Sequence, residues 1–115
     1  MPEPPALIAG PYAPPRVPPS GHLRCAVQGP VPVDGWTDAP IPWPYRAQPG
    51  GKRSLIVCDD LARALRTESA QAVAHWWGVS RWSVGRWRRA LGVGWWTPGT
   101  LARWRALARG KLHVR

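Results

Sequence analysis

The sequence predicts a small, mainly α fold: a bundle of three to four helices in the C-terminal half, after a proline-rich and largely extended N-terminal region. The first observation behind this prediction is that 14 of the 15 prolines lie in residues 1–49, where they exclude long helices. The second is the helical spacing of apolar residues that recurs, together with helix caps, between residues 59 and 110. A chain of 115 residues has room for a single small domain.

Residues 1–21 form a proline-rich segment with few large apolar side chains. This composition favours polyproline II conformations over packing, so we expect a disordered tail that the domain does not need in order to fold. The apolar run in residues 7–10 is short and has no basic lead, so it does not predict a signal peptide.

Residues 22–53 predict an extended strap that ends in a basic linker. Leu23, Cys25 and Val27 alternate with polar residues, and the pattern breaks at positions 29–30, which favours one short β-hairpin. The tryptophan- and proline-containing piece that follows is too apolar for a pure linker, so we expect it to lie against the helices. Residues 48–54, QPGGKRS, have the composition of a flexible basic linker.

Residues 54–110 form the predicted helical domain. Residues 54–58 are apolar and β-branched, which favours either a short strand that pairs with the strap or an apolar lead into a helix. Asp59 and Asp60 supply a cap and negative charge for the first turn of a helix. The inner side of this helix is predicted to comprise Leu61, Ala64 and Leu65.

Two further helices joined by a tight turn are predicted in residues 69–91. The apolar stripe of the first comprises Ala70, Val73, Ala74 and Trp77. Gly78 ends this helix, because glycine adopts the left-handed backbone region without steric cost. Ser80 can cap the second helix, residues 81–91. The buried side of that second helix is predicted to comprise Val84, Trp87 and Leu91.

This arrangement resembles the helix-turn-helix family of DNA-binding domains, in the homeodomain-like form of bacterial transcription regulators and transposase-type proteins. The residues that carry the resemblance occupy small, glycine and apolar positions of the family pattern: Ala74, Gly78, Val79, Val84 and Trp87. The match covers about a fifth of the chain. The resemblance implies that residues 81–89 form a recognition helix that lies in the major groove of duplex DNA.

The face of this helix opposite its buried side is cationic and has no acidic residue. At about 100° per residue, that face carries Trp82, Gly85, Arg86 and Arg89, with Arg81 and Arg88 on its flanks. Gly85 has no side chain, so the helix can approach the floor of the groove. The predicted DNA-binding residues are Ser80, Arg81, Trp82, Ser83, Gly85, Arg86, Arg88 and Arg89.

A fourth helix is predicted to begin at Pro98, with Thr97 as its cap, and to end at Gly110. Its inward-facing residues are predicted to be Leu101, Trp104 and Ala108. Residues 111–115 form a basic tail. We expect Trp77, Trp87 and Trp104 to belong to the core, whereas Trp82 either contacts DNA or covers a neighbouring loop.

The net charge of +10, with no acidic residue after Glu68, indicates a polyanionic partner. No residues have the spacing of a catalytic, phosphate-cradling or metal site, so we predict a non-enzymatic protein without cofactor, metal or small-molecule substrate. The two cysteines form neither a zinc nor a disulfide pattern, which favours a reducing, cytoplasmic environment. No stretch approaches the ~20 apolar residues of a membrane span.

Two other functions are compatible with the sequence. Tryptophan stacking combined with arginine is typical of proteins that bind RNA or single-stranded nucleic acid. A tryptophan-rich surface is also compatible with a protein-interaction module. The oligomeric state is open, and a homodimer is compatible with each of these functions.

Overall fold

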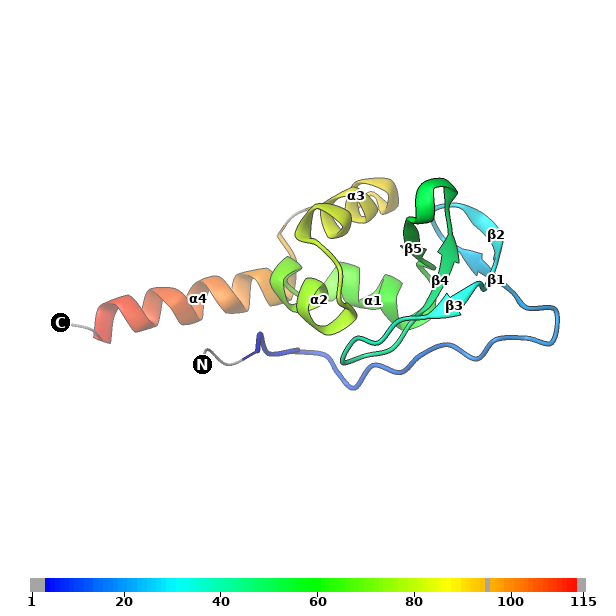
Figure 1. Ribbon diagram of the computed structural model, residues 1–115. Helices are drawn as coiled ribbons and strands as arrows, with labels where there is room; N and C mark the ends of the chain where they lie inside the picture. Colours follow the sequence, from blue (N-terminus) through cyan, green and yellow to red (C-terminus); the bar gives the residue numbers. More distant parts are fainter. Residues whose placement is uncertain (1–3, 95, 114–115) are drawn as a thin grey trace.

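The computed structural model describes residues 4–94 and 96–113, with side chains up to residue 109. Within these ranges the chain is α+β, with four α-helices and two small antiparallel sheets (Figure 1). The prediction of a mainly α bundle is therefore wrong, because the strap and the linker form strands. In order, the elements are β1 (His22–Cys25), β2 (Gly29–Pro32), β3 (Gly35–Trp36), β4 (Pro44–Ala47), β5 (Arg53–Leu55), α1 (Asp59–Thr67), α2 (Ala70–Trp77), α3 (Arg81–Leu91) and α4 (Pro98–His113).

The first sheet is the short hairpin expected in the strap. β1 pairs with β2, and Leu23 lies opposite Val31. The chain reverses at residues 26–28, before the Gly-Pro pair, because residues 29 and 30 already belong to β2. Pro30 and Pro32 are tolerated because a two-stranded sheet has only edge strands.

The second sheet has the strand order β3-β4-β5 and is antiparallel throughout. Tyr45 pairs with Leu55, so the first two residues of the run 54–58 belong to a strand that pairs with the strap. The turn between β4 and β5 is closed by a hydrogen bond from the Gln48 N–H to the Lys52 carbonyl, 2.8 Å long. Residues 48–54 are therefore the end of a β-hairpin, whereas the sequence predicted a flexible linker.

The core combines the strap with the helices. Trp43 is fully buried, and its indole N–H donates to the Ile56 carbonyl across 2.8 Å. The rings of Trp43 and Trp77 pack edge to face with their centroids 5.9 Å apart. Trp87 is 4% exposed, so the prediction that it belongs to the core is confirmed.

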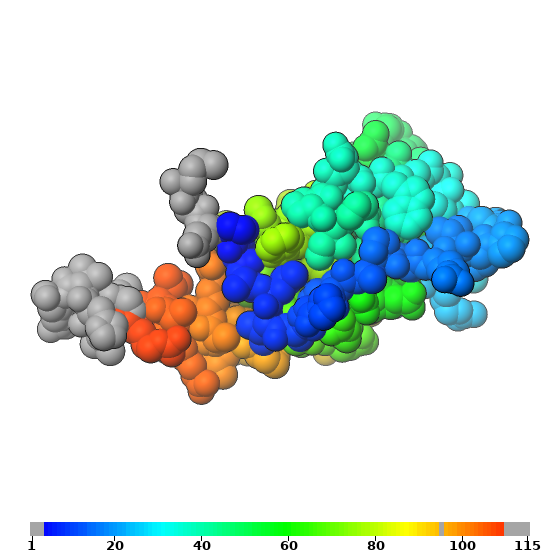
Figure 2. Space-filling model, turned by 90° about the horizontal axis from the view of Figure 1, so that it is seen from below, coloured from blue at the N-terminus to red at the C-terminus, as the bar shows by residue number. Residues whose placement is uncertain are grey.

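The N-terminal segment is extended but docked on the helices, whereas we expected a disordered tail. Figure 2 shows it as a continuous band across the surface of α1 and α2. Tyr12 is 9% exposed and packs edge to face on Trp77, with the ring centroids 5.3 Å apart. Farther toward the N-terminus, the Pro5 carbonyl accepts a 2.6 Å hydrogen bond from the Trp76 indole. The segment is thus held by hydrogen bonds, by the buried Tyr12 ring and by the partly buried side chains of Leu7 and Ala9, which pack against the core.

Glu68 lies where α1, α3 and the start of α4 meet. Its backbone carbonyl accepts hydrogen bonds from the Arg88 guanidinium on α3 and from the Thr97 hydroxyl, the latter 2.6 Å long. Gly99 packs on the same backbone, where a Cβ would lie 2.7 Å from the Glu68 Cα. The start of α4 is therefore fixed by a contact that only glycine permits.

Beyond its first turns α4 projects from the body of the domain (Figure 1). Leu101 is 38% exposed and Trp104 is 60% exposed, so the prediction that they pack inwards is wrong. The physical reason is that Ala102, Arg103 and Ala106 line the side of α4 that borders the N-terminal segment. The helix continues through Gly110 to His113, and residues 114–115 of the predicted basic tail lie outside the described residues.

Cys25 and Cys58 are buried free thiols. Burial, with the nearby Asp59 carboxylate, raises the pKa of Cys58 to about 12, so this thiol is a poor nucleophile at neutral pH. In the described ranges no three His, Cys, Asp or Glu side chains gather into a group that could hold a metal ion. Nor does any helix within those ranges have the length and apolar character needed to cross a membrane.

Candidate nucleic-acid interface

α2 and α3 are two helices joined by a short turn, at the positions predicted from the sequence. Gly78 ends α2 in the left-handed region at φ 70°, and its N–H donates to the Ala74 carbonyl. A side chain at Gly78 would also crowd Ala39 of the strap, because a Cβ there would lie 2.9 Å from the Ala39 Cβ. Val79 is partly buried and packs against the core. The turn thus has both the conformation and the close packing that require glycine.

Ser80 and Ser83 fix the start of α3. The Ser80 hydroxyl oxygen accepts a hydrogen bond from the Ser83 N–H at 3.1 Å, which is the predicted N-cap. The same hydroxyl donates to the Ser83 hydroxyl, also across 3.1 Å. These two predicted site residues are therefore engaged with each other, and Ser83 is half-buried.

The solvent side of α3 presents the predicted cationic face. Trp82 is 72% exposed, and the Arg86 guanidinium lies over its ring, 5.1 Å from the centroid. This cation–π contact holds two large side chains in one arrangement on the surface. The exposed residues of this face are Arg81, Trp82, Gly85, Arg86 and Arg89.

Arg88 does not lie on that face. It is 5% exposed, and its guanidinium donates to the carbonyls of Leu65, across 3.0 Å, and Glu68 at the C-terminal end of α1. The flank position predicted for Arg88 is wrong, because a residue four places after Val84 lies only about 40° from it around a helix. Burial lowers the pKa of Arg88, and the two carbonyl oxygens compensate for its lost hydration.

A groove runs along each side of α3. One, about 380 Å³ in volume, separates α3 from the second sheet and is lined by Thr37, Asp38, Arg53, Ser83 and Arg86, among others. The other, about 450 Å³, lies between α3 and the starts of α2 and α4, where its polar lining includes Gln71, Arg81, Arg89 and Thr100. The exposed arginines of α3 therefore border two different grooves.

Asp38 is the one acidic residue among the described residues that line the two grooves beside α3. No acidic residue follows Glu68 in the chain, and the Glu68 side chain is itself fully buried. Asp60 is paired with Arg63 at 3.4 Å. Asp38 is exposed and lines the groove on the sheet side. The exposed arginines therefore give the described surface around α3 a positive electrostatic potential, which attracts anions.

Several groove residues are not among the DNA-binding residues predicted from the sequence, and they include Arg53, Gln71 and Thr100. Arg53 was assigned to a flexible linker, although the basic composition of residues 48–54 was a signal in the right place. Gln71 and Thr100 come from helices that flank α3 only in the folded chain. Comparisons with protein-family models, curated proteins and solved structures give no match. Function is therefore inferred from the geometry of this surface.

Proposed function

We propose that this protein binds duplex DNA without catalysis, with α3 as its recognition helix. The observation that carries the proposal is the exposed face of α3. It holds four large side chains, three of them arginines, no acidic residue, and a glycine where a side chain would stand between the helix and its partner: Arg81, Trp82, Gly85, Arg86 and Arg89.

The dimensions of the helix favour a duplex. An α-helix with side chains is about 10–12 Å wide and fits the B-DNA major groove, about 12 Å wide. Arginine can donate two parallel hydrogen bonds to the edge of guanine, and an aromatic ring can contact a thymine methyl group. Arg86 and Arg89 would then read bases, and Trp82 would contact a methyl group or a sugar.

The firm anchoring of α3 in the domain also supports the proposal that α3 reads bases. α3 is anchored by Val84, Trp87 and Arg88, which are all nearly or fully buried. A contact that discriminates bases needs side chains held in a reproducible position, because a small displacement breaks hydrogen-bond geometry. The stacking of Arg86 on Trp82 reduces the freedom of the exposed side chains in the same way.

Single-stranded nucleic acid is the second candidate, because Trp82 is 72% exposed. Bases stack on exposed aromatic rings without regard to sequence. Trp96 and Trp104 form a further exposed aromatic pair, with their ring centroids 6.4 Å apart. A protein-interaction module built on the exposed apolar residues of α4 is the third candidate. A homodimer is compatible with a nucleic-acid partner and with a protein partner.

The deciding experiment compares affinities for random duplex DNA, single-stranded DNA and single-stranded RNA of equal length in a salt series. We expect the duplex to bind tightest, with log Kd rising linearly with log salt concentration. The slope is expected to be about 0.9 per phosphate contact, for ~4 to 6 contacts. Tighter binding of a single strand, abolished by Trp82→Ala, would favour the second candidate. Self-association without retention of nucleic acid would favour the third.

A further inference from the structure

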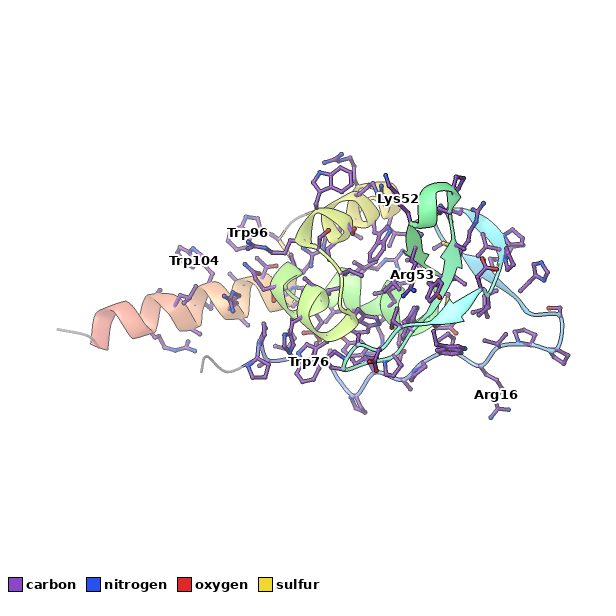
Figure 3. All side chains as sticks on the ribbon, in the orientation of Figure 1. Arg16, Lys52, Arg53, Trp76, Trp96 and Trp104 are labelled. Atoms are coloured by element: carbon purple, nitrogen blue, oxygen red, sulfur yellow. The ribbon has the colours of Figure 1, made fainter. Side chains whose placement is uncertain are left out.

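The hairpin formed by β4 and β5 stands beside α3 (Figure 1). Leu55 of β5 and Trp87 of α3 line the same groove, so the two elements are neighbours in space. The turn of this hairpin carries Lys52, which is exposed, and Arg53 follows it at the start of β5 (Figure 3). Two cations thus lie next to the predicted recognition helix but outside it.

Arg53 is held in place although it is exposed. Its guanidinium lies over the ring of Tyr45 on β4, 4.8 Å from the centroid. Tyr45 is itself fixed, because it pairs with Leu55 and packs closely on Gly35, where a Cβ would lie within 2.4 Å of the Tyr45 hydroxyl. Stacking leaves the N–H groups of the guanidinium edge able to donate to a ligand.

The groove between the sheet and α3 joins this arginine to the recognition helix. Arg53 lines it from β5, and Arg86 and Ser83 line it from α3. Asp38 supplies the opposing charge, which leaves one net positive charge and several N–H and O–H donors. An anion with several acceptor oxygens fits such a lining better than a neutral or cationic ligand.

We propose that the β4–β5 hairpin is a second nucleic-acid contact, in which Arg53 binds a backbone phosphodiester beside the bases that α3 reads. This inference rests on the proposed function, because a helix that fills the major groove brings the phosphates of both strands to its flanks. Arg81 borders the groove on the other flank. Each strand of the duplex therefore meets arginine on its own side of α3.

The test uses the full chain with Arg53→Gln, which removes the guanidinium and its charge and leaves a shorter, uncharged polar side chain. The matched control is Arg16→Gln, because Arg16 is exposed and lies at the lower edge of Figure 3, away from α3. Two duplexes are used: the preferred duplex, which is selected from random oligonucleotides by its binding to the wild type, and a scrambled duplex. The affinity for each is measured in a salt series, after thermal melting shows that each variant is folded.

We expect Arg53→Gln to weaken binding to both duplexes by a similar factor, roughly tenfold at low salt, and to lower the log-log salt slope by about 1. The ratio between preferred and scrambled duplex stays unchanged, because a phosphate contact carries no sequence information. Asp38→Asn, which removes the opposing charge from the same groove, strengthens binding to both. Arg16→Gln changes affinity much less than Arg53→Gln and leaves the slope close to that of the wild type.

Failure of this inference and failure of the proposed function give different results. A wild-type protein that binds duplex with a steep salt slope, combined with an Arg53→Gln variant that matches Arg16→Gln, overturns the hairpin contact alone. A loss of the sequence preference in Arg53→Gln also overturns it, because Arg53 would then read bases. A wild-type protein that does not bind duplex overturns both proposals.

Discussion

The hydroxyl group of Tyr12 donates a hydrogen bond to the Glu68 carboxylate across 2.7 Å, although 56 positions separate the two residues. The N–H groups of Ile8 and Ala9 donate to the same carboxylate at 2.8 and 2.9 Å. A fully buried carboxylate thus obtains three donors from one segment. The N-terminal segment and the helical part therefore form one structural unit, because removal of the segment would leave a buried charge without these donors.

Tyr12→Phe tests this unit. We expect the free energy of unfolding in denaturant to fall by about 1.5–3 kcal/mol, the usual contribution of a hydrogen bond to a charged group. Burial and the Glu68 carboxylate raise the pKa of Tyr12. The contribution of its protonated hydroxyl is therefore fully present below about pH 10, where the unfolded phenol ionises, and declines at higher pH. Tyr45→Phe is the control, and an equal loss in both variants would contradict the specific role of Tyr12.

Arg88 and Arg89 are neighbours with opposite predicted roles. Arg88→Ala leaves the buried carbonyls of Leu65 and Glu68 without their donor, so we expect the free energy of unfolding to fall by about 2–3 kcal/mol. Arg89→Ala changes an exposed residue and is expected to stay within about 0.5 kcal/mol of the wild type. Denaturant unfolding of both variants checks this, and similar stabilities would show that Arg88 does not cap α1.

Trp87 and Trp104 are also expected to differ in how much they contribute to stability. Trp87→Ala removes a nearly buried ring from the contact of α3 with the core, and we expect a loss of about 3–5 kcal/mol. Trp104 is 60% exposed, so Trp104→Ala is expected to cost far less. Thermal melting measures both. A large loss for Trp104→Ala at protein concentrations that exclude association would mean that α4 packs on the domain.

Gly85→Ala separates stability from binding. A Cβ at position 85 would meet no atom within 4 Å, and Gly85 is inside α3, so alanine is expected to stabilise the protein by about 0.5–1 kcal/mol. The same methyl group would stand between the helix and the floor of the DNA groove. We therefore expect a higher melting temperature together with weaker duplex binding. A variant that is stabilised and binds as well as the wild type would place Gly85 outside the contact.

Arg86 and Arg89 are expected to provide sequence preference. Replacing either by alanine is predicted to cost about 1–3 kcal/mol on a selected site and much less on scrambled duplex. Arg103 on α4 serves as a control, because it lies outside the exposed face of α3. Its replacement is expected to weaken both duplexes equally or not at all. If Arg86→Ala and Arg89→Ala lose equal affinity for selected and scrambled DNA, α3 contacts phosphates and does not read bases.

The helices around the turn could be predicted from the sequence because their signals are local. Ser80, Gly78 and the apolar spacing of Val84 and Trp87 determine where α3 begins and which side it buries. The same helical spacing places Arg88 about 40° from Val84, on the buried side of α3. Helix geometry alone is therefore enough to predict which residues form the cationic face.

The features that were missed depend on partners distant in sequence. β4 begins at a proline and β5 has only three residues, so neither has a strong strand pattern until the two pair. The docking of residues 4–13 depends on hydrogen bonds to Glu68, which lies almost sixty positions later, and sequence patterns do not reveal such a pairing. The stripe of Leu101 and Trp104 has helical spacing, but spacing does not reveal whether a surface exists for it to cover.

The position of Glu68 in the chain has a consequence for synthesis. During translation, residues 5–13 are made before their partners Glu68 and Trp76, which follow some sixty to seventy positions later. The Glu68 carbonyl acquires its last donor only when Thr97 has been added. A nascent chain that stops before Thr97 cannot complete this junction, so the contacts around Glu68 can all be in place only after residue 97 has been synthesised.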